Sequence, residues 1–283
     1  MTEPVTIRWQ TGSGIELAGS AYGDPTHPGV VLLHGGGQTR HAWGGTGQKL
    51  SDASFYAVTL DLRGHGESSW APDGDYSMDA FVKDLSTLLD DHFDRPPAVV
   101  GASIGGLTGL VLEGESEQSR ASALVLVDSA PKMEREGVAR VLTFMRANPD
   151  GFASLGEAAN FIATYLPHRK RSKDLSGLSK NLRLGDDGRY RWHWDPRFIN
   201  RAKKDPTFSY ERFSKAAQAL TIPTLLVRGR LSDVLSEESA DDFKKHAPHA
   251  EYVDIANAAH MVAGDRNDLF TNAVVEFLQR TLP

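Results

Sequence analysis

The chain has 283 residues, of which 40% are hydrophobic and 24% charged, as expected of a globular protein with its own core. The absence of cysteine excludes disulfides, cysteine-ligated metal centres and a cysteine nucleophile. The net charge of -6 argues against a nucleic-acid-binding surface, and no signal peptide or membrane-spanning apolar stretch is evident. We therefore expect a cytoplasmic protein without nucleic-acid or membrane partners.

Short apolar segments rich in β-branched residues recur along the chain and alternate with segments of helical spacing. The predicted strands are 5–9 and 15–22, which form a hairpin, followed by 30–33, 56–60, 98–100, 124–127, 224–227 and 252–255. Ser77 and Ser236 are expected to cap helices, and a further helix is expected over 270–278. Continuous apolar strands alternating with helices predict an α/β fold with a mostly parallel sheet.

One long interval interrupts this alternation between the strands 124–127 and 224–227. It contains helical segments at 138–146 and 155–165 and a short basic run at 168–171. We interpret the interval as a helical cap inserted into the core and expect the basic run to be a solvated surface. The predicted organisation is a core over 1–130, a cap over 131–221 and the rest of the core over 222–283.

The most informative motif is Gly101-Ala102-Ser103-Ile104-Gly105, which follows a predicted strand and leads into a helical segment. A G-x-S-x-G sequence in this context is typical of a sharp turn that exposes a nucleophilic serine, here Ser103. By itself the pentapeptide is equally consistent with a glycine-rich turn carrying an idle serine. Neither phosphate-binding glycine pattern, G-x-x-x-x-G-K-[ST] nor G-x-G-x-x-G, occurs at this turn.

A serine nucleophile needs a base and an acid that orients the base. Asp233 and His260 each lie just beyond a predicted strand, so parallel strands would bring both to the edge that carries Ser103. Asp128, which ends the strand 124–127, is the rival acid, although it can instead cap the next turn. We prefer Asp233 to Asp128.

Hydrolysis through an acyl-enzyme also needs donors for the oxyanion of the tetrahedral intermediate. Ile104 follows the nucleophile at a predicted helix start, and its backbone N–H is one candidate. The sequence His34-Gly35-Gly36-Gly37 follows the strand 30–33, and Gly36 is preferred to Gly37 as the second donor. The alternative is a plain glycine turn. Zinc-binding histidine spacings are absent from the sequence.

Three tryptophans are candidates for substrate binding. Trp192 and Trp194 alternate with His193, so an extended backbone places the two indoles on one side and the imidazole on the other. Packing of the cap on the core is the favoured role of this pair, and lining of the pocket by at least one indole is the alternative. Trp43, which follows the glycine loop, is treated in the same way. His193 is expected to pack or to touch substrate.

Together these segments resemble the α/β-hydrolase superfamily. The residues that carry the resemblance are His34-Gly35-Gly36-Gly37, Asp61-Leu62-Arg63-Gly64-His65-Gly66-Glu67-Ser68, Gly101 to Gly106, Asp233 and Ala259-His260. The resemblance implies an eight-stranded, mostly parallel sheet with a helical cap after strand 6, and it supports Asp233 through its usual spacing from Gly229. It is closest to the single-cap branch of carboxylesterases, enol-lactonases and cofactor-free haloperoxidases. Epoxide hydrolases and haloalkane dehalogenases have an aspartate nucleophile where this sequence has Ser103.

We therefore expect a Ser103–Asp233–His260 hydrolase that cleaves a carboxylic ester or lactone of a small, hydrophobic substrate without a cofactor or metal. Perhydrolysis or carbon–carbon bond hydrolysis on the same triad is the alternative, and a slow-turnover ligand-binding relative is less favoured. The expected partners are the substrate and water, and self-association into a homodimer is left open by the sequence.

Overall fold

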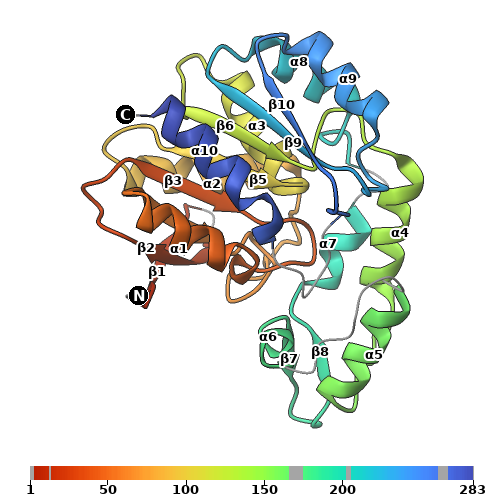
Figure 1. Ribbon diagram of the computed structural model, residues 1–283. Coiled ribbons are helices and arrows are strands. Elements are labelled where there is room, and N and C mark those ends of the chain that lie inside the picture. The colour runs from red at the N-terminus through yellow and green to blue at the C-terminus, as the bar shows by residue number, and fades with distance from the viewer. Residues whose placement is uncertain (1–2, 13, 166–174, 202–204, 261–266, 283) are drawn as a thin grey trace.

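The computed structural model describes residues 3–12, 14–165, 175–201, 205–260 and 267–282 (Figure 1). Its main sheet has eight strands in the order β1-β2-β4-β3-β5-β6-β9-β10. The strands are β1 (Val5–Gln10), β2 (Glu16–Tyr22), β3 (Gly29–Leu33), β4 (Tyr56–Leu60), β5 (Ala98–Ala102), β6 (Ala123–Val127), β9 (Thr224–Gly229) and β10 (Glu251–Ile255). The β1–β2 hairpin and the β2–β4 pairing are antiparallel, whereas the pairings from β4 through to β10 are parallel. The predicted eight-stranded, mostly parallel sheet is confirmed.

Helices cover both faces of the sheet, which explains why the central strands are continuously apolar. Helices α1 (Gly44–Asp52) and α10 (Thr271–Thr281) pack on one face, together with Val30, Val100 and Val125 from the strands. Helices α2 (Met78–His92), α3 (Ile104–Glu115) and α8 (Tyr210–Ala219) cover the other face, and α9 (Glu237–His246) packs beside α8. Ser77 and Ser236 cap α2 and α9 as predicted. Each fully buried valine or leucine contributes about 1.5 to 3 kcal/mol, so these two layers hold the strand ends rigidly.

The inserted segment lies to one side of this layered core (Figure 1). Its elements, which we call the cap, are α4 (Arg135–Arg146), α5 (Leu155–Tyr165), α6 (Ser176–Ser179), β7 (Leu182–Leu184), β8 (Tyr190–Trp192) and α7 (Pro196–Arg201). Helix α8 lies within the range 131–221 that was predicted for the cap, yet it packs against α3 on one face of the main sheet. It therefore belongs with the core, and the cap is shorter than expected at its C-terminal end.

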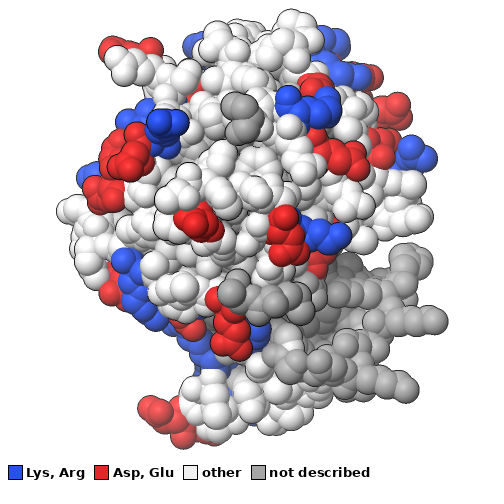
Figure 2. Space-filling view, turned by 60° about the vertical axis from the view of Figure 1, so that its left-hand side comes forward, with Lys and Arg blue, Asp and Glu red and all other residues white. Residues whose placement is uncertain are grey.

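On the face drawn in Figure 2, the described Lys and Arg side chains are intermixed with Asp and Glu and form no large region of one charge. The predicted solvated basic run at 168–171 lies outside the described residues. Among the helices that the structure describes, none is long and apolar enough to cross a membrane.

Candidate active site

Ser103 occupies a strained turn between β5 and α3. Its backbone has φ 48° and ψ -117°, a sparsely populated conformation that costs about 1 to 3 kcal/mol for a residue with a side chain. The turn needs glycine on both sides: a Cβ at Gly101 would lie 2.3 Å from the backbone of Gly105 and Gly106, and one at Gly105 would lie 2.7 Å from Leu33. Ser103 stays partly exposed at the end of the strand. The geometry is that of the predicted nucleophile turn.

His260 pairs with Asp128, and not with the predicted Asp233. The His260 Nδ1 atom lies 2.6 Å from Asp128 Oδ2, and both side chains are at least nine-tenths buried. Asp233 instead forms an ion pair with Arg140 of α4 at 2.8 Å, and 42% of its side chain is exposed. The residue of this loop that faces the His260–Asp128 pair is its neighbour, Ser232. The predicted pairing of Asp233 with His260 is therefore wrong, and the residue paired with His260 is Asp128, the rival candidate.

The Asp128 carboxylate is held by two further donors from the loop after β9. The Ser232 hydroxyl donates to Oδ2 at 2.7 Å, and the Gly229 N–H donates to Oδ1 at 3.3 Å. Ser232 Oγ in turn accepts from the N–H groups of Val234 and Leu235, so its own hydrogen is directed at the carboxylate. Hydrogen bonds of this kind fix the orientation of the carboxylate. Ser232 was not among the predicted site residues, although it immediately precedes Asp233 in the sequence.

The glycine loop after β3 lies directly against Ser103. A Cβ at Gly35 would lie 3.4 Å from that of Ser103, and Gly37 has φ +77°, which glycine adopts without strain. The Gly35 N–H donates to the side-chain oxygen of Gln38 at 3.0 Å, and Gln38 bonds to the amide of Asn267 at 3.2 Å. Both amide side chains are buried, and Asn267 belongs to the core segment 222–283, so this segment supports the glycine loop.

Hydrogen bonds to Gly35 set the direction of the Gly36 N–H. The Gly35 carbonyl accepts from Gln38 N at 3.1 Å and from His34 Nδ1 at 2.7 Å. Because the Leu62 N–H donates to His34 Nε2, the neutral ring carries its hydrogen on Nδ1, and burial lowers the pKa of His34 and so favours that neutral form. The C=O and N–H of a trans peptide point in opposite directions, so these bonds also aim the Gly36 N–H. Its role as an oxyanion donor, with Ile104 at the first position of α3, stays a prediction.

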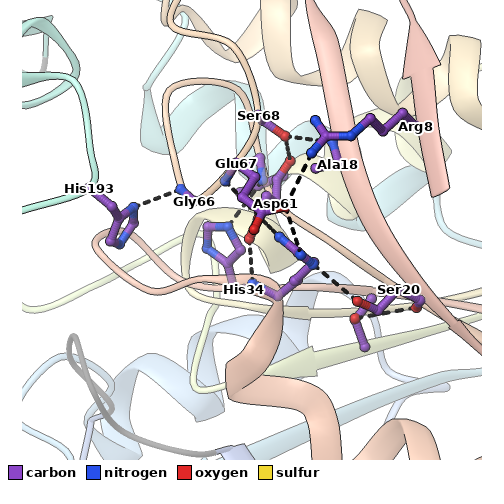
Figure 3. Close-up of polar contacts among 12 residues, drawn as sticks. Arg8, Ala18, Ser20, His34, Asp61, Gly66, Glu67, Ser68 and His193 are labelled. Atoms are coloured by element: carbon purple, nitrogen blue, oxygen red, sulfur yellow. Dashed lines mark hydrogen bonds and ion pairs between the residues drawn. The ribbon is translucent and has the colours of Figure 1, made fainter. Parts of the chain in front are cut away.

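The geometry of the glycine loop depends on the turn 61–68 behind it (Figure 3). The fully buried Asp61 carboxylate accepts the backbone N–H of Arg40 at 2.6 Å and that of Glu67 at 2.9 Å, and it also pairs with the Arg40 guanidinium. The Ser68 hydroxyl donates to the Asp61 carbonyl at 2.6 Å. A buried carboxylate with this many donors fixes both segments that flank it.

The three tryptophans are buried. Trp43 is fully buried between the sheet and helices α1 and α10, and its indole N–H donates to the Leu33 carbonyl at 3.0 Å. It is a core residue, as in the favoured packing role, and it does not line the pocket at Ser103, which corrects the alternative that placed it at the substrate. Trp192 and Trp194 stack with ring centroids 4.7 Å apart, and thus lie on one side as predicted. Trp192 packs on Phe144 and Phe152 within the cap.

Trp194 is the indole nearer the glycine loop. A Cβ at Gly37 would lie 3.4 Å from its ring, and one at Gly36 would lie 3.5 Å from Phe198 and 3.9 Å from Met145. Apolar cap side chains therefore cover the loop that approaches Ser103. Contact of Trp192 or Trp194 with a substrate stays a prediction.

A small pocket joins the candidate residues. The pocket is lined by Gly35, Gln38, Ala102, Ser103, Val127, Asp128, His260, Asn267 and Phe270. The pocket thus brings together Ser103, the His260–Asp128 pair and the glycine loop, with apolar side chains on its wall. Among the residues that the structure describes, no cluster of His, Asp and Glu side chains is arranged to hold a metal ion.

Comparisons with known proteins agree with this architecture. Residues 28–266 match the sequence profile of proteins with the alpha/beta hydrolase fold. The chain is 29% identical to the esterase Rv0045c of Mycobacterium tuberculosis, over 99% of this chain and 89% of that protein. It is 25% identical to the 3-hydroxybutyrate-oligomer hydrolase of Cupriavidus necator, over 86% of each chain.

Solved structures show the same fold over nearly the whole chain. A structure of esterase Rv0045c superposes with a TM-score of 0.75 at 25% identity and covers 100% of this chain and 93% of its own. An alpha/beta hydrolase from Novosphingobium aromaticivorans superposes with a TM-score of 0.81 at 23% identity and covers 99% of both chains. The profile match, the sheet order and the strained serine turn together show that the chain belongs to the α/β-hydrolase fold family, whose members related to it include ester hydrolases.

Proposed function

We propose that the protein hydrolyses a carboxylic ester or lactone of a small, hydrophobic substrate through an acyl-enzyme on Ser103. The observation that carries the proposal is the buried His260–Asp128 pair, which lines the same pocket as a serine on a strained, glycine-flanked turn. The esterases among the sequence relatives support this reaction class. The apolar wall contributed by Ala102, Val127 and Phe270 supports a small hydrophobic group near the reacting carbon.

In the first step Ser103 Oγ attacks the ester carbon and His260 Nε2 takes the serine proton. Asp128 holds the imidazole with its Nδ1–H toward the carboxylate and stabilises the imidazolium that forms. The Gly36 and Ile104 N–H groups stabilise the oxyanion. The imidazolium then protonates the leaving alcohol oxygen as the carbon–oxygen bond breaks. Water attacks the acyl-enzyme by the same route, which releases the carboxylic acid and restores the serine.

A fluorophosphonate label with peptide mapping, combined with p-nitrophenyl esters of increasing acyl length, tests the proposal. We expect labelling at Ser103, loss of label and turnover in Ser103→Ala, and faster turnover of short acyl chains than of long ones. Ser129→Ala is the control, because the Ser129 hydroxyl only donates to the Ser103 carbonyl at 2.8 Å. It should still be labelled. Labelling at another residue, or ester turnover that survives in Ser103→Ala, would refute the mechanism.

A further inference from the structure

His193 of the cap bridges two loops of the core. In the chain it stands between Trp192 and Trp194, whose indoles stack on each other, and it is 1% exposed. The Gly66 N–H donates to its Nδ1 at 2.7 Å, and its Nε2 lies 3.2 Å from the Gly37 carbonyl (Figure 3 shows the contact with Gly66). Because Nδ1 accepts, the neutral ring carries its hydrogen on Nε2 and donates it to Gly37. Burial lowers the pKa of His193 to about 3, so the ring is neutral near pH 7.

The bond to Gly37 begins a chain of hydrogen-bonded peptide groups. The Gly37 carbonyl belongs to the same peptide group as the Gln38 N–H, which donates to the Gly35 carbonyl at 3.1 Å. The Gly35 carbonyl in turn belongs to the same peptide group as the Gly36 N–H. The hydrogen bonds therefore run in series from the imidazole N–H through two peptide groups, the second of which carries the Gly36 N–H, the proposed oxyanion donor. Hydrogen bonds in such a series polarise one another, and each restrains the plane of the next peptide.

The other ring nitrogen ties this chain to a rigid support. Gly66 has φ +54°, and a Cβ there would lie 2.2 Å from the buried Asp61 carboxylate, so this turn tolerates little movement. Arg183 donates to the Gly66 carbonyl at 2.6 Å. The cap is also fastened without the imidazole, because Trp70 Nε1 donates to the His193 carbonyl at 3.2 Å and Asp195 N donates to the Gly64 carbonyl at 2.9 Å. Within this set of contacts, the imidazole is the group that reaches the glycine loop.

We propose that His193 is a positioning residue that, from the cap, orients and polarises the Gly36 N–H for the oxyanion of the transition state. The inference rests on the proposed function and deepens it. Packing of the cap on the core would then complete the oxyanion site, because the first donor in this series of hydrogen bonds, His193, is a cap residue.

Two substitutions by amide side chains distinguish the hydrogen bond of Nε2 from that of Nδ1. The side-chain amide of His193→Gln can reach the place of Nε2 and donate to Gly37, whereas that of His193→Asn reaches only the place of Nδ1 and accepts from Gly66. His193→Leu provides neither contact. Removal of one oxyanion donor typically costs about 10² to 10³ in rate, so weakening one should lower kcat about 10- to 100-fold in the Asn and Leu variants. The Gln variant should retain kcat within about threefold of wild type, and KM should change little in all three.

An aryl trifluoromethyl ketone provides a second readout, since its serine adduct carries an oxyanion. Its affinity should fall in proportion to kcat/KM across the variants. Trp70→Phe is the matched control, because it removes a hydrogen bond from the core to the same cap residue without touching the chain, and its kcat should equal that of wild type. If Asn retains as much activity as Gln, or Trp70→Phe loses as much as Asn, the imidazole merely packs and the inference is wrong. The comparison requires a wild-type enzyme labelled at Ser103, so failure of that label would overturn the proposed function instead.

Discussion

Replacement of Asp128 by asparagine removes a negative charge from the partner of His260 while it preserves the shape of the side chain. The carboxylate accepts three hydrogen bonds, from His260 and Ser232 on Oδ2 and from Gly229 on Oδ1. An asparagine has one acceptor oxygen and an NH₂ group. Either orientation of the amide therefore places that NH₂ against at least one of the three donors.

Each orientation has a cost for catalysis. With the amide oxygen toward His260 the imidazole keeps its orientation, but no charge stabilises the imidazolium. With the NH₂ toward His260 the ring is forced to carry its hydrogen on Nε2, and it cannot accept the proton of Ser103. The same replacement in a serine-protease triad lowers kcat by about 10⁴. We expect a loss of about 10³ to 10⁴ here, which corresponds to about 4 to 5.5 kcal/mol of transition-state stabilisation.

The assay is kcat for a short-chain p-nitrophenyl ester, with thermal unfolding measured in parallel to verify that the variant is folded. Asp233→Asn is the matched control. It neutralises a carboxylate whose ion pair with Arg140 is largely exposed, and such pairs contribute about 0 to 1 kcal/mol to stability. This variant should keep its activity within about twofold of wild type, because the transition state makes no contact with it.

The opposite pattern would refute the assignment. If Asp233→Asn lost turnover and Asp128→Asn kept more than a tenth of it, the acid would reside on the loop after β9. The hydrogen bond between His260 and Asp128 would then be a structural contact only.

Three further predictions concern the supports of the site. Ser232→Ala should lower kcat about tenfold, because a hydrogen bond to a charged group is worth about 1.5 kcal/mol or more; a change in Tm alone would contradict this role. Acidification from pH 7 to pH 5 should reduce the free energy of unfolding by about 2 kcal/mol more in wild type than in His193→Gln, as measured by denaturant titration at both pH values. The sign follows because His193 has its ordinary pKa near 6.5 in the unfolded state and a pKa of about 3 in the folded state. Between these two values the unfolded protein binds a proton that the folded protein does not. The free energy of unfolding therefore decreases as pH falls below 6.5. Equal decreases in wild type and in His193→Gln would disprove this contribution of His193. Gly101→Ala should destabilise the fold by about 2 to 3 kcal/mol and abolish fluorophosphonate labelling, because its Cβ would overlap the backbone of α3. Gly12→Ala, whose Cβ would meet nothing within 4 Å, should leave both unchanged.

Local patterns in the sequence were sufficient for the strands and for the nucleophile turn. Strands such as β3 and β5 are buried on both faces, so their apolar runs are continuous and visible without a structure. The turn at Ser103 is also local, since its glycines relieve contacts within a few residues of the serine or with the adjacent strand. The place of His260 beyond the last strand follows from chain order in a parallel sheet.

The acid, by contrast, is decided by the packing of two loops. Asp128 and Asp233 both follow parallel strands, and nothing in their local sequence indicates which carboxylate turns toward the histidine. In the structure Asp128 has φ 49° and points to His260, while Ser232 takes the inward position after β9 and leaves Asp233 facing Arg140. A shift of one residue along a loop reverses the direction of its side chain.

Sequence alone thus predicted the fold class, the serine turn, the place of the histidine beyond the last strand and the glycine loop, because each depends on burial pattern, on chain order or on contacts close in the chain. Only the tertiary structure decided the acid, the core position of Trp43 and the bridge from His193 to Gly37. These depend on pairs of residues far apart in sequence, whose hydrogen bonds form only when the cap and the strand-end loops are packed together.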